Sequence, residues 1–227
     1  MIREDIAAVI PAYNCGTSIG AVVAGARKVL ADVVVVSDGS SDDTAEQALA
    51  AGGRLEILPE NRGKGCALRR GIELALERKP AALVLLDGDG QHDPGDLPAL
   101  LAAWDGGELD LVVGARLQDS QRIPKVRFWT NYIGTRILSW MSELELEDSQ
   151  SGYRIIASDL ARRMRLRSDG YAIESEMLIK AGKLAARLGH VPVRTIYNEE
   201  ESHFRPLIDT LRIALASIQF KVEDDLS

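Results

Sequence analysis

The strongest constraint on the fold is an alternation of short apolar runs with amphipathic segments along the first half of the chain. The runs are continuous and rich in valine, leucine and isoleucine, without a polar residue at every second position. Strands that are buried on both faces of a sheet have this composition. Runs of strand length occur at residues 6–10, 33–36, 55–58, 82–86 and 109–113.

Segments with helical spacing separate these runs, at residues 17–30, 42–51, 64–78 and 97–104. This β-α-β-α order predicts an α/β fold, with a mostly parallel sheet and helices on both of its faces. A length of 227 residues suits a single domain. Beyond Arg116 the pattern changes, and we expect an elaboration of the same sheet. It predicts a loop at 117–127, helices at 128–144, 172–188 and 206–222, and strands at 152–157 and 191–196.

Polar stretches follow the first two strands, IPAYN at residues 10–14 and SDGSSDDT at residues 37–44. Each has two interpretations, a turn with a helix cap or a ligand site, because open α/β sheets bind ligands at the carboxyl ends of their strands. In the first interpretation Ser41 caps the second helix. Similarly, Asp93-Pro94 would begin the helix after the fourth strand.

The stretch NRGKG follows the third strand. Gly63 and Gly65 permit close approach of a backbone or a ligand, and Arg62 and Lys64 offer positive charge to a phosphate. The glycine spacing fits neither a Walker A loop nor a dinucleotide-binding fingerprint. It therefore suggests phosphate binding without naming the nucleotide.

The fourth strand ends in LVLLDGDGQHD, which places three aspartates within seven residues. Carboxylates this close repel one another, so the stretch predicts a bound cation unless it is only a solvated turn. Asp87 and Asp89 can face one ion, and Gln91 can add a carbonyl oxygen. Oxygen ligands favour Mg²⁺ or Mn²⁺ over zinc. A calcium-binding EF-hand loop is excluded, because His92 stands where that loop needs glycine.

Composition narrows the class of partner. The net charge of −7 argues against nucleic acid, whose phosphate backbone attracts a basic face. Cys15 and Cys66, the only cysteines, favour free thiols in a reducing compartment over a disulfide. No apolar run reaches the roughly 18 residues that span a bilayer. We expect a cytoplasmic protein, either free or peripheral at the cytoplasmic face of a membrane.

Six motifs occur in the order and approximate spacing of glycosyltransferase family 2. They are VIPAYN, SDGSSDDT, NRGKG, LDGDGQHDP, GAR and SQSGYR, within residues 5–212. The chain resembles the dolichyl-phosphate and polyprenyl-phosphate mannosyltransferase-like branch of this family. The resemblance implies a single Rossmann-like GT-A domain over 1–227, with a nucleotide-sugar half (1–116) and an acceptor-side half (117–227) that ends in an amphipathic helix. The implied reaction is metal-dependent and inverting, and it moves a hexose of the mannose or glucose type from a GDP- or UDP-sugar.

The resemblance also carries roles onto matching donor-side positions. The nucleoside pocket would comprise Pro11, Ala12, Tyr13, Asn14, Asp38 and Gly39. The diphosphate and metal site would comprise Asp87, Gly88, Asp89 and Gln91, with Arg62, Gly63 and Lys64 nearby. Two positions depart from the family pattern: Cys15 stands where glutamate is frequent, and Ser37 where aspartate is frequent. Both lie in the base-reading region, so GDP and UDP donors both remain open.

On the acceptor side, the resemblance assigns Arg116 a contact to sugar or phosphate. The motif that would line the acceptor comprises Gln150, Ser151, Gly152, Tyr153 and Arg154. His203 matches a histidine found in many members of the branch. The catalytic set implied for the two halves together is Asp89, Arg116, Asp148 and Glu174.

Two types of acceptor are considered, and polyprenyl phosphate is favoured over a hydroxyl. A lipid phosphate is already anionic but needs cations to hold it, whereas a hydroxyl of a saccharide or small metabolite needs a general base. Asp148 and Glu174 are the candidate bases. The candidate cations are Arg116, Arg122, Lys125, Arg127, Arg154, His203 and Arg205, unless they only form a solvated face. A third alternative is a protein that binds nucleotide sugars without turnover.

Two helices raise the question of membrane contact. The terminal one places Leu207, Leu211, Leu215 and Ile218 near one face, which would pack on the domain or lie on a membrane surface. Trp129, Tyr132 and Trp140 on the earlier helix admit the same two interpretations.

Overall fold

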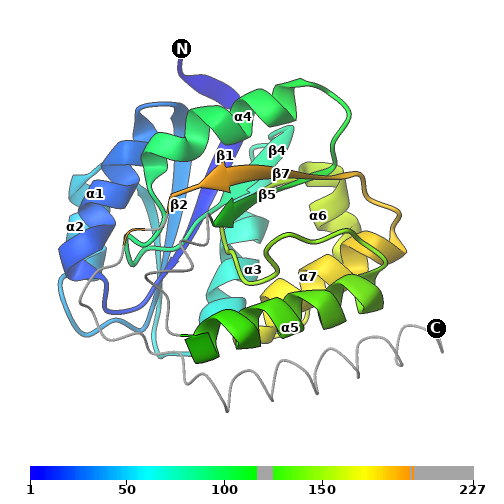
Figure 1. The fold of residues 1–227 in the computed structure, drawn as a ribbon. Coiled ribbons are helices and arrows are strands. Elements are labelled where there is room, and N and C mark those ends of the chain that lie inside the picture. Colours follow the sequence, from blue (N-terminus) through cyan, green and yellow to red (C-terminus); the bar gives the residue numbers. More distant parts are fainter. Residues whose placement is uncertain (117–124, 195, 197–227) are drawn as a thin grey trace.

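The computed structural model describes residues 1–116, 125–194 and 196, and of residues 125–130 only the backbone. These residues form a seven-stranded sheet in the order β3-β2-β1-β4-β6-β5-β7 (Figure 1). β6 runs antiparallel to both of its neighbours, while the other adjacent strands are parallel. The predicted α/β fold with a mostly parallel sheet is confirmed.

The elements follow the chain in the alternating order that the sequence predicts. The strands are β1 (Arg3–Ala12), β2 (Leu30–Asp38), β3 (Arg54–Leu58), β4 (Ala82–Leu85), β5 (Leu111–Arg116), β6 (Arg154–Ala157) and β7 (Leu188–Val193). The helices are α1 (Gly16–Arg27), α2 (Thr44–Ala50), α3 (Lys64–Leu76), the 3₁₀ turn η1 (Pro94–Asp96), α4 (Leu97–Asp105), α5 (Lys125–Ser142), α6 (Ser158–Met164) and α7 (Ala172–Lys183).

Helices cover both faces of the sheet and bury a separate apolar cluster against each face. On one face α1, α2 and α4 pack over side chains such as Ile10 and Val35. On the other face α3, α5, α6 and α7 pack over side chains such as Val9 and Val36. Neighbouring residues of β1 and β2 thus point into opposite clusters, which explains why their apolar runs are continuous.

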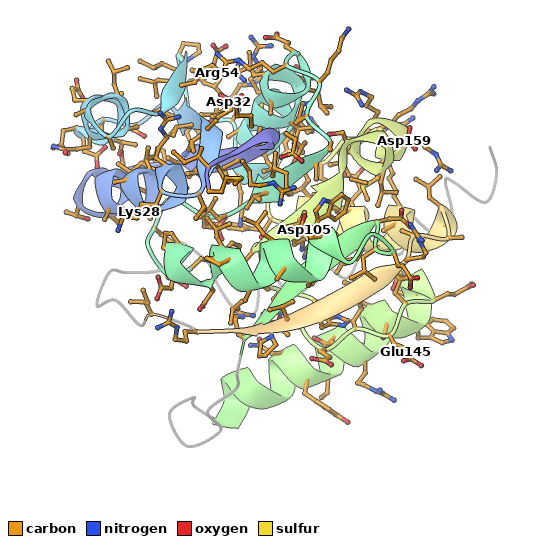
Figure 2. The ribbon with its side chains drawn as sticks, turned by 90° about the horizontal axis from the view of Figure 1, so that it is seen from above. Lys28, Asp32, Arg54, Asp105, Glu145 and Asp159 are labelled. Carbon is orange, nitrogen blue, oxygen red and sulfur yellow. The ribbon has the colours of Figure 1, made fainter. Side chains whose placement is uncertain are left out.

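Charged side chains brace the sheet at its β3 edge. The Asp32 carboxylate on β2 accepts hydrogen bonds from Arg54 on β3 at 3.0 Å and from Arg78 at 3.1 Å. Asp32 and Arg54 lie together in Figure 2. Asp32 is only 7% exposed, so these partners satisfy a carboxylate that would be costly to bury alone.

The second half of the chain differs from the prediction in four elements, α5, α6, α7 and β7. α7 ends at Lys183 because Ala185 adopts a left-handed φ of 54°, and Leu188 then pairs with Leu111 on β5. β7 therefore starts three residues earlier than the sequence suggested. α6 was not predicted, and α5 begins at Lys125, inside the expected loop.

The carboxyl ends of β1, β2, β4 and β5 meet at one edge of the sheet. β1 lies between β2 and β4, which is the point where successive strands change direction across the sheet and where α/β proteins commonly bind ligands. Because β6 is antiparallel, its first residue, Arg154, lies at this same edge, paired with Leu85. The topology therefore brings the stretch before Arg154 beside the acidic stretch that follows β4.

Candidate active site

The loop after β4 carries the acidic stretch, and hydrogen bonds hold its conformation. The Gln91 N–H donates to Asp89 Oδ1 at 2.9 Å. The Ser18 hydroxyl on α1 donates to the Gly88 carbonyl at 2.8 Å. Gly90 has a φ of 74°, a left-handed conformation that glycine adopts without strain. The sequence places the glycines where the chain must curl around its own carboxylates.

The far end of this loop rests on a stacked pair of buried rings. His92 lies over Tyr153 at a centroid distance of 5.2 Å and an interplanar angle of 25°. Burial lowers the pKa of His92, despite the nearby Asp87, so the imidazole is neutral at pH 7. The Asp93 carboxylate accepts a hydrogen bond from the Gly95 N–H at 2.7 Å. The predicted start of a helical turn at Asp93-Pro94 is confirmed.

Lys64, the first residue of α3, lies between two carboxylates from other elements. Its Nζ is 2.7 Å from Asp87 Oδ1 and 2.5 Å from Glu174 Oε1 on α7. Burial alone would lower the pKa of Lys64, but the two carboxylates outweigh burial and raise it. Burial opposes ionisation of Asp87 as well, and Lys64 and other nearby cations hold its pKa below the usual range. Lys64 and Asp87 are both charged at neutral pH.

Gly152 closes this cluster from the β6 side. A Cβ at this position would lie 2.9 Å from Asp87 Oδ2 and 3.1 Å from Glu174 Oε1, so a larger residue would displace one of the carboxylates. A small cavity beneath the cluster is lined by Lys64, Asp87, Gly152, Glu174 and apolar side chains that include Met177. The donor-side and acceptor-side motifs therefore meet at one place.

The acidic loop suits a hard divalent cation that brings further ligands with it. Asp87, Asp89 and Gln91 offer only oxygen donors, as Mg²⁺ and Mn²⁺ prefer. Among the described residues, no group of three or more His, Cys, Asp and Glu side chains could hold a metal ion. Magnesium typically binds one or two carboxylates together with substrate phosphates and water. The donor set fits a metal that is bound jointly with a diphosphate.

The NRGKG turn, for which the sequence suggested phosphate binding, contacts a carboxylate and backbone atoms of the protein itself. The amides of Arg62 and Gly63 donate to the Asp38 carboxylate at 2.9 and 2.8 Å. A Cβ on Gly65 would clash with the carbonyl oxygen of Ser168. The close approach that these glycines permit is thus used by neighbouring loops of the chain itself.

The residues predicted for the nucleoside pocket differ in exposure. Tyr13 and Asn14 are exposed, whereas Pro11, Ala12 and Asp38 are buried. Asp38 is 2% exposed and bonded to two amides, so it fixes the turn rather than facing solvent. Gly39 supports the same turn with a φ of 65°. Among the residues predicted for the nucleoside pocket, Tyr13 and Asn14 are therefore the ones with exposed side chains.

The helix cap predicted at Ser41 is wrong. The Ser41 N–H donates to the Asn14 side chain at 2.9 Å, and α2 begins three residues later, at Thr44. The Asp42 carboxylate accepts from the Thr44 N–H at 3.1 Å and from the Gly16 N–H at 2.9 Å. One aspartate therefore serves the starts of two helices, an arrangement that a local pattern does not reveal.

Arg116 and Asp148 form a two-bonded ion pair at the end of β5. Arg116 Nε and Nη2 donate to the two Asp148 oxygens at 2.7 and 3.0 Å. Asp148 is 3% exposed; burial opposes its ionisation, but Arg116 outweighs burial and lowers the pKa of Asp148. A carboxylate in this state is a weak base. The sequence suggested that Asp148 is a general base. The geometry instead favours a role in which Asp148 orients Arg116.

Arg154 is fully buried and bonded to backbone. It donates to the carbonyls of Ser151 at 2.9 Å, Glu174 at 3.0 Å and Ser149 at 3.1 Å. These bonds hold the turn that contains Gln150 and Gly152 against α7. The geometry favours a positioning role for Arg154, behind the surface that a substrate would touch.

Some predicted contacts lie outside the described residues. Arg122, His203 and Arg205 are among them, as are the side chain of Arg127 and the terminal segment 206–222. The other predicted site residues gather around the carboxyl edge of the sheet. Sequence analysis missed Ser18, whose partner Gly88 is 70 residues away, because no local pattern signals such a contact.

The fold and the acidic loop at its carboxyl edge define the class of protein, a glycosyltransferase with the GT-A fold. The chain matches the family model described as glycosyl transferase family 2 over residues 7–166. It therefore belongs to glycosyl transferase family 2, and the predicted resemblance is confirmed.

Two relatives are similar to the chain along most of their length. The chain is 31% identical to an undecaprenyl-phosphate mannosyltransferase of Micrococcus luteus, covering 84% of this chain and 83% of the relative. It is 30% identical to a UDP-N-acetylglucosamine–dolichyl-phosphate N-acetylglucosaminyltransferase of Methanococcus voltae, covering 88% of each. The similarity to these proteins agrees with the polyprenyl-phosphate branch of the family.

A solved structure supports the fold. Glucosyl-3-phosphoglycerate synthase from Mycobacterium tuberculosis, in complex with Mn²⁺ and UDP-glucose, aligns with a TM-score of 0.74 at 21% identity. The alignment covers 96% of this chain and 79% of that one. The predicted GT-A fold is confirmed.

Proposed function

We propose that this glycosyltransferase moves a hexose from a GDP- or UDP-linked sugar to a polyprenyl phosphate, using Mg²⁺ or Mn²⁺. The observation that carries the proposal is the acidic loop Asp87–Gln91 beside Lys64, at the carboxyl edge of the sheet. Relatives named for undecaprenyl-phosphate and dolichyl-phosphate transfer support the lipid acceptor. The structural neighbour that binds Mn²⁺ with UDP-glucose supports a metal-bound nucleotide sugar.

In the proposed reaction an acceptor phosphate oxygen bonds to the anomeric carbon as the bond to the nucleoside diphosphate breaks, which inverts the configuration. Asp89 and Gln91, with Asp87, would hold the metal, which supplies a Lewis acid for the departing diphosphate. Lys64 keeps Asp87 ionised. Arg116 contributes a positive charge whose orientation Asp148 fixes.

The state of the two candidate bases favours a phosphate acceptor over a hydroxyl. Asp148 is bonded to Arg116, and Glu174 is bonded to Lys64. A hydroxyl acceptor needs a base that can take its proton, whereas a phosphate oxygen is already anionic near neutral pH. Both predicted bases are thus engaged in ion pairs with cationic side chains.

An exposed apolar stripe on α5 suits a lipid-borne acceptor. Tyr132, Ile133, Ile137 and Trp140 are 49–74% exposed, and their spacing places them on one side of the helix, around the exposed Arg136. Amphipathic aromatic side chains beside a cation are typical of a membrane interface. No helix in the described part of the chain is long and apolar enough to cross a membrane. The contact that we propose is a peripheral one, made by the stripe on α5.

A transfer assay tests the proposed function. The purified protein would be incubated with polyprenyl phosphate in detergent and with radiolabelled GDP-mannose, UDP-glucose or UDP-N-acetylglucosamine, in Mn²⁺ or in EDTA. We expect label in the organic extract for one donor, and only with metal. Label released as free sugar, or transferred only to added saccharides, would contradict the lipid acceptor. Donor binding without transfer to any acceptor would favour a binding protein.

The stripe is tested separately with vesicles of phosphatidylcholine and phosphatidylglycerol. Burying a large apolar side chain stabilises association by about 1.5–3 kcal/mol, so Ile137→Glu with Trp140→Glu should weaken vesicle binding at least about tenfold. The control pair, Leu49→Glu with Ile57→Glu, changes exposed apolar residues on other elements and should bind like the wild type. If the wild type does not bind vesicles, or if it forms a dimer that Ile137→Glu with Trp140→Glu disrupts, the stripe does not face lipid.

A further inference from the structure

The chain leaving β7 is bonded to the acidic loop and to the residues that follow it, Asp93 and Asp96. The Arg194 N–H donates to Asp96 Oδ2 at 2.8 Å, and its Nε and Nη2 donate to Asp96 Oδ1 at 3.1 and 3.0 Å. Arg194 Nη2 also lies 2.9 Å from Asp93 Oδ2. Two residues further on, the Ile196 N–H donates to the Gln91 carbonyl at 3.0 Å. Arg194 and Ile196 are called the β7 exit below.

These bonds fix the part of the loop that the core does not reach. Ser18 anchors the loop at Gly88, and the stacking of His92 on Tyr153 anchors its far end inside the protein. The β7 exit holds the backbone of Gln91, the Asp93 carboxylate just before η1 and the Asp96 carboxylate within η1. The Asp96 side chain is 13% exposed, so Arg194 bonds to a carboxylate that is mostly withdrawn from water.

We propose that Arg194 is a positioning residue for metal and nucleotide binding, acting through the loop that contains Asp89 and Gln91. The inference rests on the proposed role of this loop as the metal site. With the β7 exit in place, the Gln91 backbone is fixed from outside while its N–H fixes the Asp89 carboxylate. Without Arg194, the chain around Ile196 is no longer held by Asp93 and Asp96, which weakens the Ile196–Gln91 bond. Asp89 and Gln91 must then be ordered when the metal binds.

The same strand offers a matched control at its other end. Arg187 precedes β7 and donates to Asp110 with the same three groups: N–H at 2.9 Å, Nε at 3.1 Å and Nη2 at 3.2 Å. The two arginine side chains are similarly exposed, 58% for Arg187 and 64% for Arg194. Arg187 therefore makes the same type of contact to one aspartate as Arg194 makes to Asp96, away from the acidic loop.

The test compares Arg194→Ala with Arg187→Ala by two measurements on the full chain. Hydrogen exchange of the amides of residues 88–92, without metal, reports the order of the loop. Mn²⁺ affinity in the presence of GDP or UDP, measured by electron paramagnetic resonance, reports binding. We expect faster exchange in the Arg194 variant alone and about tenfold weaker Mn²⁺ binding, as for other residues that orient metal ligands. Arg194→Lys, which keeps the charge but loses the fork, should recover only part of the affinity.

Two results would overturn the inference. Equal exchange in the two alanine variants would show that Arg194 does not order the loop, whatever the metal does. Equal Mn²⁺ affinity in both variants would show that ordering of the loop by Arg194 does not affect how its residues bind the metal. If the wild type itself binds no Mn²⁺ with either nucleotide, the proposed metal site fails and this inference fails with it.

Discussion

Asp89→Asn should lower the rate of sugar transfer by about 10²–10³-fold, the loss typical when one group that stabilises developing charge is removed. The asparagine Oδ1 can still accept the hydrogen bond from the Gln91 N–H, which is 2.9 Å in the wild type. The substitution therefore removes the negative charge while keeping the shape of the loop. We expect the metal-dependent part of donor binding to disappear and the melting temperature to stay unchanged.

Calorimetric titration with the donor in Mn²⁺ and then in EDTA measures this effect. Asp110→Asn is a suitable control, because Asp110 is also hydrogen-bonded but pairs with Arg187 away from the loop. Unchanged donor affinity of the Asp89 variant in Mn²⁺ would rule out Asp89 as a metal ligand. An equal loss in the Asp110 variant would point to a general effect on folding.

Lys64→Met should destabilise the fold by about 3 kcal/mol at neutral pH, the low end of the cost of removing one partner from a buried ion pair. The side chains of Lys64, Asp87 and Glu174 are 17%, 23% and 15% exposed, so water offers the remaining carboxylates little compensation. Methionine keeps the length and the apolar contacts of the lysine stem. The loss therefore reports the missing ammonium charge.

The pH dependence of this loss has a definite sign. Lys64 and other nearby cations lower the pKa of Asp87, so Asp87 stabilises the folded wild type above its unfolded pKa, and this stability is lost as pH falls. In the variant Asp87 loses the first of these partners. The difference in unfolding free energy should therefore be large at pH 7 and shrink as pH falls below about 4, near the unfolded pKa of aspartate. Urea unfolding at several pH values measures it, and a pH-independent difference would contradict the ionic role of Lys64.

Much of the fold was predictable because its signals are local. Continuous apolar runs marked β1, β2, β4 and β5, and Asp93-Pro94 marked the turn before α4. The prediction failed where a contact with a residue far away in the sequence determines the local structure. Leu188 extends a helical pattern in sequence, yet it pairs with Leu111 in the sheet. Ser41 resembles a helix cap, yet its amide bonds to Asn14.

The sequence by itself determined the strand order along the chain, the acidic stretch after β4 and the family. These features depend on spacing and residue type within short segments, where backbone geometry leaves few alternatives. Only the tertiary structure decided which charges pair: Lys64 with Asp87 and Glu174, Arg116 with Asp148, and Arg194 with Asp96. Such pairs join residues that are far apart in the chain, and their formation depends on burial and on the antiparallel course of β6. The two candidate bases, Asp148 and Glu174, are ion-paired in the structure because a buried charge requires a partner of opposite sign.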